Sequence, residues 1–143
     1  MCKLLFKFTA ATWIVLWLVL SASMMNMVSA QTGEPEFKLM NGKVDIGTFN
    51  GWRRFHSTCH VCHGPDALGS SFGPNLIDSL KTMDYQTFIE TVTNGRQTTR
   101  VSGEVSVMPA FGKDPNVAKH LDDIYRFLTA RAKGGLAPGR PKK

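Results

Sequence analysis

The chain has 143 residues and a formal net charge of +6, from 17 basic and 11 acidic residues. This length favours a single domain, and the absence of interleaved basic and aromatic residues argues against nucleic-acid binding. The last thirteen positions hold five of the basic residues: Arg131, Lys133, Arg140, Lys142 and Lys143. Such a cluster either steers an acidic partner at long range or belongs to a solvated basic C-terminal tail, residues 134–143.

Residues 1–30 have the pattern of a secretion signal. Two lysines give a positive start, an apolar run extends to Leu20, and small residues precede a cleavage site after Ala30. The alternative is a membrane anchor, but a spanning helix needs about 20 apolar residues, and polar residues follow this run closely. We therefore predict export to the periplasm and no stable membrane insertion after cleavage. The mature chain would begin at Gln31 and, without the two lysines, carry +4.

The remaining sequence predicts a small domain, residues 48–133, preceded by an N-terminal arm, residues 31–47, in which no clear period is visible. A first helix is expected to begin near Thr48 and to run into a pair of cysteines. The glycine, proline and serine content of residues 64–74 then indicates a loop.

Apolar residues recur at helical spacing in residues 84–94 and again in residues 115–132, and Gly95 is a natural stop for the first of these helices. A polar stretch, residues 96–106, separates them, with a turn expected at Gly103. Alternation typical of a strand is almost absent, so we expect an all-α fold with three main helices and loops. The core of so small a domain is modest, and many such domains need a metal or another staple.

The stretch Cys59-His60-Val61-Cys62-His63 is the C-x-x-C-H pattern of covalent haem attachment. Two thiols three residues apart on one helical turn can each add to a vinyl group of the same porphyrin edge, and the following histidine is then held under the iron. A thioredoxin-like C-x-x-C expects a βαβ context, and a zinc site needs further ligands. We therefore predict one haem c bound to Cys59 and Cys62, with His63 as an iron ligand.

A sixth iron ligand must come from elsewhere, and Met108 is the leading candidate. Pro109 restricts the backbone beside its thioether, and Phe111 could pack on the porphyrin. A thioether opposite an imidazole also raises the reduction potential. Met83 is more typical of core filling, and Met40 lies in the predicted arm.

Further positions are given expected roles by their places along the chain. The carbonyl of Pro74 could accept the proton of the His63 ring nitrogen that does not bind iron, although an ordinary loop proline is the alternative. Gly51 is expected to let the last helix cross closely, against Tyr125 or Phe127. His120 is a remote candidate for the distal iron ligand, whereas His56 and His60 are expected to be surface or packing residues.

Around these motifs the chain resembles class I cytochromes c, which share an all-helical fold around one haem with histidine and methionine ligands. The resemblance is closer to the cytochromes that serve pyrroloquinoline-quinone (PQQ) methanol dehydrogenases, particularly the lanthanide-dependent type. It is carried by residues 51–56, 62–66, 69–74, 78–82, 94–96, 108–112, 122–125 and 139–141. Residues 31–47 add nothing to it.

The resemblance implies a periplasmic electron carrier. A PQQ-dependent methanol dehydrogenase would give it electrons one at a time, and a downstream cytochrome or oxidase would receive them. One alternative is a general soluble cytochrome c that donates to a terminal oxidase. Another is a haem enzyme or gas sensor with an open iron site. The sequence shows no nucleophile–base arrangement, so we do not expect an enzyme.

Overall fold

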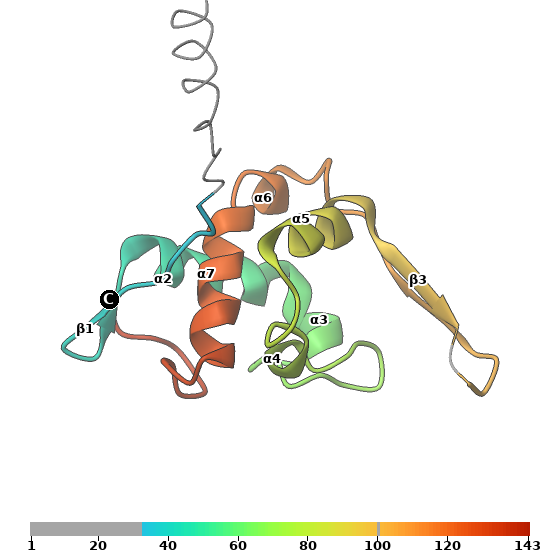
Figure 1. Ribbon diagram of the computed structural model, residues 1–143, viewed down its shortest axis with the longest axis horizontal. Helices are drawn as coiled ribbons and strands as arrows, with labels where there is room; N and C mark the ends of the chain where they lie inside the picture. Colours follow the sequence, from blue (N-terminus) through green and yellow to red (C-terminus); the bar gives the residue numbers. More distant parts are fainter. Residues whose placement is uncertain (1–32, 100) are drawn as a thin grey trace, which may run out of the picture. The chain divides into compact units, whose positions relative to one another are not determined.

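The computed structural model describes residues 33–99 and 101–143 (Figure 1). The predicted signal at residues 1–30 and its cleavage site lie outside the described residues. Within those ranges, every helix is too short or too polar to cross a membrane. Residues Glu34–Lys143 form one unit, with the elements β1 (Leu39–Met40), β2 (Lys43–Val44), α2 (Ile46–Arg54), the π-helical η1 (Phe55–Cys59), α3 (His60–His63), α4 (Leu76–Ser79), α5 (Tyr85–Asn94), β3 (Arg96–Thr99), β4 (Val105–Met108), α6 (Pro115–Ala118) and α7 (Leu121–Ala132).

The crossing of α2 and α7 organises the core. Gly51 of α2 makes the close approach possible, because a Cβ added there would lie 1.8 Å from the backbone oxygen of Asp123. The expected crossing against Tyr125 or Phe127 is therefore displaced by about half a helical turn to one turn, because the nearest backbone is that of Asp123 and Ile124. Phe127 instead packs on Phe55, with ring centroids 5.4 Å apart, and burying each such side chain contributes about 1.5–3 kcal/mol.

Helix α7 also contacts α5 and α4, so that it lies between α2 and these helices (Figure 1). Tyr85 at the start of α5 donates a hydrogen bond to Asp122, and its ring contacts that of Tyr125, with centroids 4.9 Å apart. Burial and this hydrogen bond raise the pKa of Tyr85 to about 12, so the phenol remains a neutral donor at neutral pH. The contact fixes α5, which carries one wall of the site described below.

Two of the predicted helices are interrupted. The first begins at Ile46 and widens into the π-helical segment η1 before α3, a departure that is common at functional sites. The last is divided into α6 and α7 because His120 has φ −130° and ψ 20°. There its ring contacts Asn50 of α2, with a nitrogen–nitrogen distance of 3.2 Å. The prediction for α5 is confirmed, with Asp84 as N-cap and Gly95 as C-cap.

The expectation that strands are almost absent is wrong for residues 96–108. Strands β3 and β4 pair antiparallel, with Arg96 opposite Met108 and Thr98 opposite Ser106. The hairpin extends from the end of α5 (Figure 1), and Gly103 lies in its turn with φ +83°. All four residues of β3 are exposed, so no alternation between buried and exposed residues marks that strand in the sequence.

The arm and the tail are both attached to the helices. Residues 39–44 form a short hairpin around Asn41 and Gly42, which have positive φ as an Asn-Gly turn requires. The backbone nitrogen of Val44 donates to the carbonyl of Lys142 at 2.8 Å. The guanidinium of Arg140 lies over the ring of Trp52, 5.5 Å from its centroid. The tail therefore packs on the domain along part of its length.

Arg131 does not belong to a solvated basic cluster. Its side chain is buried. One guanidinium nitrogen donates to the carbonyl of Leu136 at 2.6 Å, and the other donates to the carbonyl of Asp66 at 3.2 Å. Asp66 also accepts a hydrogen bond from the backbone nitrogen of Gly139, at 2.7 Å. Arg131 thus joins the tail to the loop after α3, and the exposed charge of this region comes from the remaining basic residues.

Candidate haem-binding site

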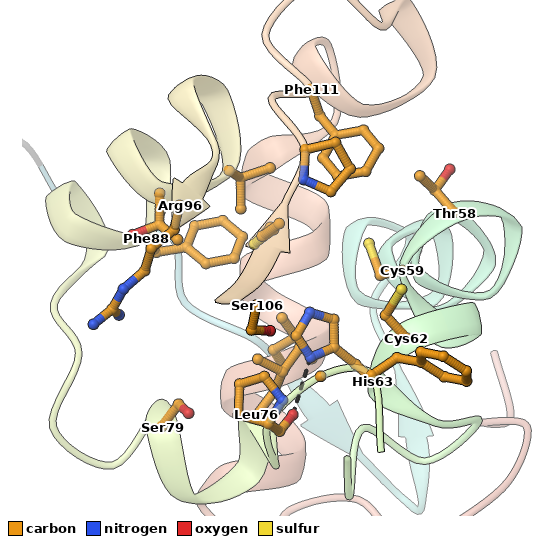
Figure 2. Close-up of a pocket in the computed structure, with 18 of the residues that line it drawn as sticks. Thr58, Cys59, Cys62, His63, Leu76, Ser79, Phe88, Arg96, Ser106 and Phe111 are labelled. Carbon is orange, nitrogen blue, oxygen red and sulfur yellow. Dashed lines mark hydrogen bonds between the residues drawn. The ribbon is translucent and has the colours of Figure 1, made fainter. Parts of the chain in front are cut away.

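A cavity of about 490 Å³ opens beside the C-x-x-C-H motif (Figure 2). Its walls come from η1 and α3, the following loop, α4, α5, the β3–β4 hairpin and α7, and they are largely apolar. The five site residues predicted from the sequence all line it: Cys59, Cys62, His63, Pro74 and Met108. Positions 49 residues apart along the chain are therefore brought to one cavity, which is what a single cofactor held at several points requires.

His63 is oriented by the loop that follows it. The ring is buried, and its Nδ1 lies 2.9 Å from the carbonyl oxygen of Pro74. Because a carbonyl can only accept, Nδ1 carries the proton, and Nε2 keeps the lone pair that a metal ligand needs. Gly73 allows this contact, since a Cβ there would lie 3.0 Å from Nδ1 and 2.9 Å from the carbonyl oxygen of Cys62.

The loop from residue 64 to residue 74 is tied to the end of α3. The Ser70 hydroxyl donates to the carbonyl of Cys62 at 2.5 Å, and the Gly69 nitrogen donates to the carbonyl of His63 at 2.8 Å. Gly69 has φ +86° and a close backbone neighbour at Asn75, so a larger residue would be strained there. The carbonyl of Pro74 is thus placed by contacts within about a dozen residues.

Cys59 and Cys62 lie at the same edge of the cavity (Figure 2) and are free thiols. Burial, with a smaller contribution from the neighbouring Cys62, raises the pKa of the Cys59 thiol to about 12. Before any bond is formed, Cys59 therefore remains a protonated thiol at neutral pH. Cys62 is exposed, so one of the two sulfurs is reachable from solvent.

Met108, the last residue of β4, is half-buried and lines the same cavity. The segment after it is fixed on the C-terminal turn of α5, where Phe111 donates to the carbonyl of Val92 at 2.9 Å. Gly95, at φ +75°, lets the two backbones meet, because a Cβ there would lie 2.6 Å from the carbonyl oxygen of Met108. Met108 is thus positioned by long-range contacts.

Comparisons with known proteins agree with this geometry. The family model described as cytochrome c oxidase, cbb3-type, subunit III matches residues 48–128. Cytochrome c-555 of Methylococcus capsulatus is 34% identical over 70% of this chain and 75% of its own. The chain belongs to the c-type cytochromes.

Two further relatives extend the match. Cytochrome c-553I of Paracoccus denitrificans is 46% identical over 76% of this chain and 48% of its own, so this cytochrome spans about half the length of that relative. The crystal structure of the c-type cytochrome XoxG from Methylobacterium extorquens AM1 superposes with a TM-score of 0.70 and 42% identity. That match covers 78% of this chain and 67% of the XoxG chain.

As a c-type cytochrome the protein binds haem c covalently, and the cavity of this structure fits that group. Its volume is within the roughly 300–1,000 Å³ of cofactor pockets, two thiols face one edge, and a buried imidazole keeps one nitrogen available. The described ranges hold no group of three or more His, Cys, Asp or Glu residues that could bind a metal ion. Cys59 and Cys62 would hold the haem through thioethers, and His63 and Met108 would ligate its iron.

The other candidate ligands of this cytochrome differ in where they lie. Met83 lines the cavity and packs against the core, as Met108 does. Met40 is 71% exposed on β1 and does not line the cavity. The Nδ1 of His120, the residue before α7, lies 3.2 Å from the side-chain nitrogen of Asn50 and 3.5 Å from a carboxylate oxygen of Asp123. The ring of His56 contacts the carbonyl of Trp52. Neither of these histidines lines the cavity.

The sequence reasoning missed the part of the wall that β3 contributes. Arg96 and Thr98 line the cavity together with Ser106 of β4. Their strand positions were read as a polar connecting stretch, and pairing with the strand that ends at Met108 turns them toward the cavity. If two strands are paired across the turn expected at Gly103, Arg96 falls opposite the predicted ligand Met108. That pairing is the signal that could have found these residues.

Proposed function

We propose that this cytochrome is a periplasmic electron carrier that accepts electrons one at a time from a PQQ-dependent methanol dehydrogenase and passes them to a downstream cytochrome or oxidase. The support is membership of the c-type cytochromes, the 42% identity with XoxG and the resemblance along residues 51–141. When bound, haem c supplies a one-electron iron couple whose potential depends on its axial ligands and surroundings. Export rests on the sequence of residues 1–30.

The residue roles in this proposal follow from the cavity. Cys59 and Cys62 would form the two thioethers, and His63 and Met108 would ligate the iron. The Pro74 carbonyl accepts a hydrogen bond from Nδ1–H of His63, at 2.9 Å. This contact is the observation that most directly supports His63 as an iron ligand. A ligand held by an outer hydrogen bond changes its position little, which suits a protein that gains and loses one electron repeatedly.

Stopped-flow reduction of the matured, oxidised cytochrome tests the donor. It is mixed with a lanthanide-dependent PQQ methanol dehydrogenase in the presence and absence of methanol, and the haem absorbance is followed. We expect methanol-dependent reduction. Absence of reduction by this enzyme, with rapid electron exchange with a terminal oxidase, would contradict the methanol dehydrogenase assignment and support the general cytochrome c.

The basic tail gives a second arm of this experiment. Truncation after Lys133 would remove the hydrogen bond between Val44 and Lys142 as well as charge, so substitution is cleaner. Lys142→Gln with Lys143→Gln removes two exposed charges and retains the backbone contact. If the tail steers an acidic partner, the association rate falls several-fold at low salt, and the loss disappears as salt rises. An unchanged rate at every ionic strength would leave the tail without a steering role.

A further inference from the structure

Arg96 lines the cavity, and the proposed haem site gives its charged side chain no role. Among the described residues that line the cavity, it alone carries a permanent charge; the others are apolar, hydroxyl-bearing or sulfur-containing residues, with His63. Its side chain is exposed, and it makes no hydrogen bond or ion pair with another described residue. Its guanidinium donors are therefore available to a negatively charged group bound in the cavity.

The position of Arg96 is set by the hairpin. Residues directly opposite each other in an antiparallel pair share a face, and the register pairs Arg96 with Met108 and Thr98 with Ser106. All four of these residues line the cavity. Met108 is the predicted iron ligand, so Arg96 is attached by the ladder to the strand residue that approaches the metal.

Arg96 lies on the opposite side of the cavity from the two cysteines (Figure 2). The chemistry of haem c fixes what that side receives. Its two thioethers form on the vinyl positions along one edge of the porphyrin, and its two propionate carboxylates are carried on the opposite edge. With Cys59 and Cys62 at one edge of the cavity, the carboxylates of a bound haem would lie toward the side of Arg96.

We propose that Arg96 binds a haem propionate. This inference rests on the proposed haem site and deepens it. A guanidinium presents a planar fork of N–H donors that matches a carboxylate in two hydrogen bonds, and such charge-assisted pairs are the stronger ones. The β3–β4 hairpin then holds the cofactor at two points, through Met108 at the iron and through Arg96 at the propionate edge.

This arrangement has an electrostatic consequence. The oxidised iron carries one positive charge more than the reduced iron, so a nearby cation favours the reduced state, and more strongly in a partly desolvated site than in water. Arg96 therefore raises the reduction potential, both by its own charge and by offsetting the negative charge of the propionate that it binds. It is a positioning residue and takes no part in a bond to iron.

Spectroelectrochemical titration of the purified holoprotein tests the proposal without any redox partner. Arg96→Gln is compared with Arg96→Lys and with Arg53→Gln, since Arg53 is an exposed arginine of α2 that does not line the cavity. We expect Arg96→Gln to lower the potential at least three times as much as Arg53→Gln, and Arg96→Lys to retain most of the wild-type value. Equal shifts for Arg96→Gln and Arg53→Gln would overturn the inference.

The outcome is separable from that of the proposed function. Absence of covalent haem from the wild-type protein would remove the site itself, and failure of methanol dehydrogenase to reduce the protein would leave these potentials untouched. Labelling of the wild-type holoprotein with phenylglyoxal, mapped by peptide mass, needs no variant. We expect Arg96 to react several-fold more slowly than Arg53, although both are exposed in the polypeptide. Equal rates would contradict the proposal.

Discussion

The two walls of the cavity that provide iron ligands differ in how they are built. On the His63 wall, the cysteines, the histidine and the Pro74 carbonyl come from 16 successive residues, 59–74, and the contacts that orient the ring lie within that stretch. On the Met108 wall, the ligand ends a hairpin that is held by α5 through Val92 and Gly95. One wall is specified locally, and the other depends on the packing of separate elements.

This difference predicts how each wall responds when the domain is destabilised. A short segment with its own hydrogen bonds can keep its geometry when distant parts of the domain are weakened. A ligand delivered by a hairpin follows the stability of the helix on which that hairpin is fixed, because local unfolding proceeds in cooperative units. We therefore expect the Met108 wall to fail first under mild perturbation, with haem still attached.

The largest expected effect is loss of the covalent haem. Replacement of both Cys59 and Cys62 by Ala removes the only atoms that can form thioethers on the His63 wall. Mass spectrometry of protein matured with haem-attachment machinery should then show the polypeptide alone, whereas the wild type carries one haem. A covalent adduct that survives in the double variant would disprove the local assignment.

Next in size is the loss of the distal ligand. Met108→Ala should remove the weak sulfur–iron charge-transfer band of the ferric protein and lower its reduction potential, while the covalent haem remains. Met83→Ala is the matched control, because Met83 also lines the cavity, and it should keep the band. The reverse pattern would transfer the distal role to Met83.

Two glycines separate the walls more finely. Gly73→Ala crowds the His63 ring, and Gly95→Ala crowds the Met108 carbonyl at φ +75°. We expect each to reduce the free energy of unfolding by about 1–3 kcal/mol, measured by denaturant titration. Gly95→Ala alone should weaken the sulfur–iron band. Gly103→Ala, strained at φ +83° but in open space, is the control, and loss of the band in all three variants would mean that the walls are not independent.

The smallest expected effect concerns the residues that cap a helix beside each wall. Asn75 caps α4 beside Pro74, while Asp84 caps α5. The hydrogen bond from the backbone of Thr87 lowers the pKa of Asp84 below its ordinary 3.8. A lowered folded-state pKa stabilises the protein above the ordinary value, and this contribution is lost as pH falls through the folded pKa.

We therefore expect acid below pH 3.8 to weaken α5, and with it the Met108 wall, before the His63 wall. Thermal unfolding of Asp84→Asn should match the wild type near neutral pH, because Asn also caps helices. Below the ordinary aspartate pKa of 3.8, the variant should lose less of its melting temperature than the wild type does. Parallel acid dependence of the two proteins would exclude this cap as a contributor.

The features of the site that the sequence could predict belong mainly to the His63 wall. The C-x-x-C-H motif, His63 as the residue after the second cysteine, and the reach from His63 to Pro74 are written in consecutive residues, so their grouping at one cavity wall could be anticipated. The amphipathic period of α5 likewise identified its bounds closely. These features depend on backbone reach and side-chain period, which a sequence displays directly.

Other features were decided by the tertiary structure. The β3–β4 hairpin escaped detection because its strands are largely exposed and carry no buried face, and with it Arg96 escaped as a residue of the cavity. The close approach of Gly51 to Asp123 depends on the crossing angle of two helices. Arg131 became an internal donor because the tail folds back over the loop after α3. A sequence encodes local period and reach, whereas packing between distant segments determines which side chains finally meet.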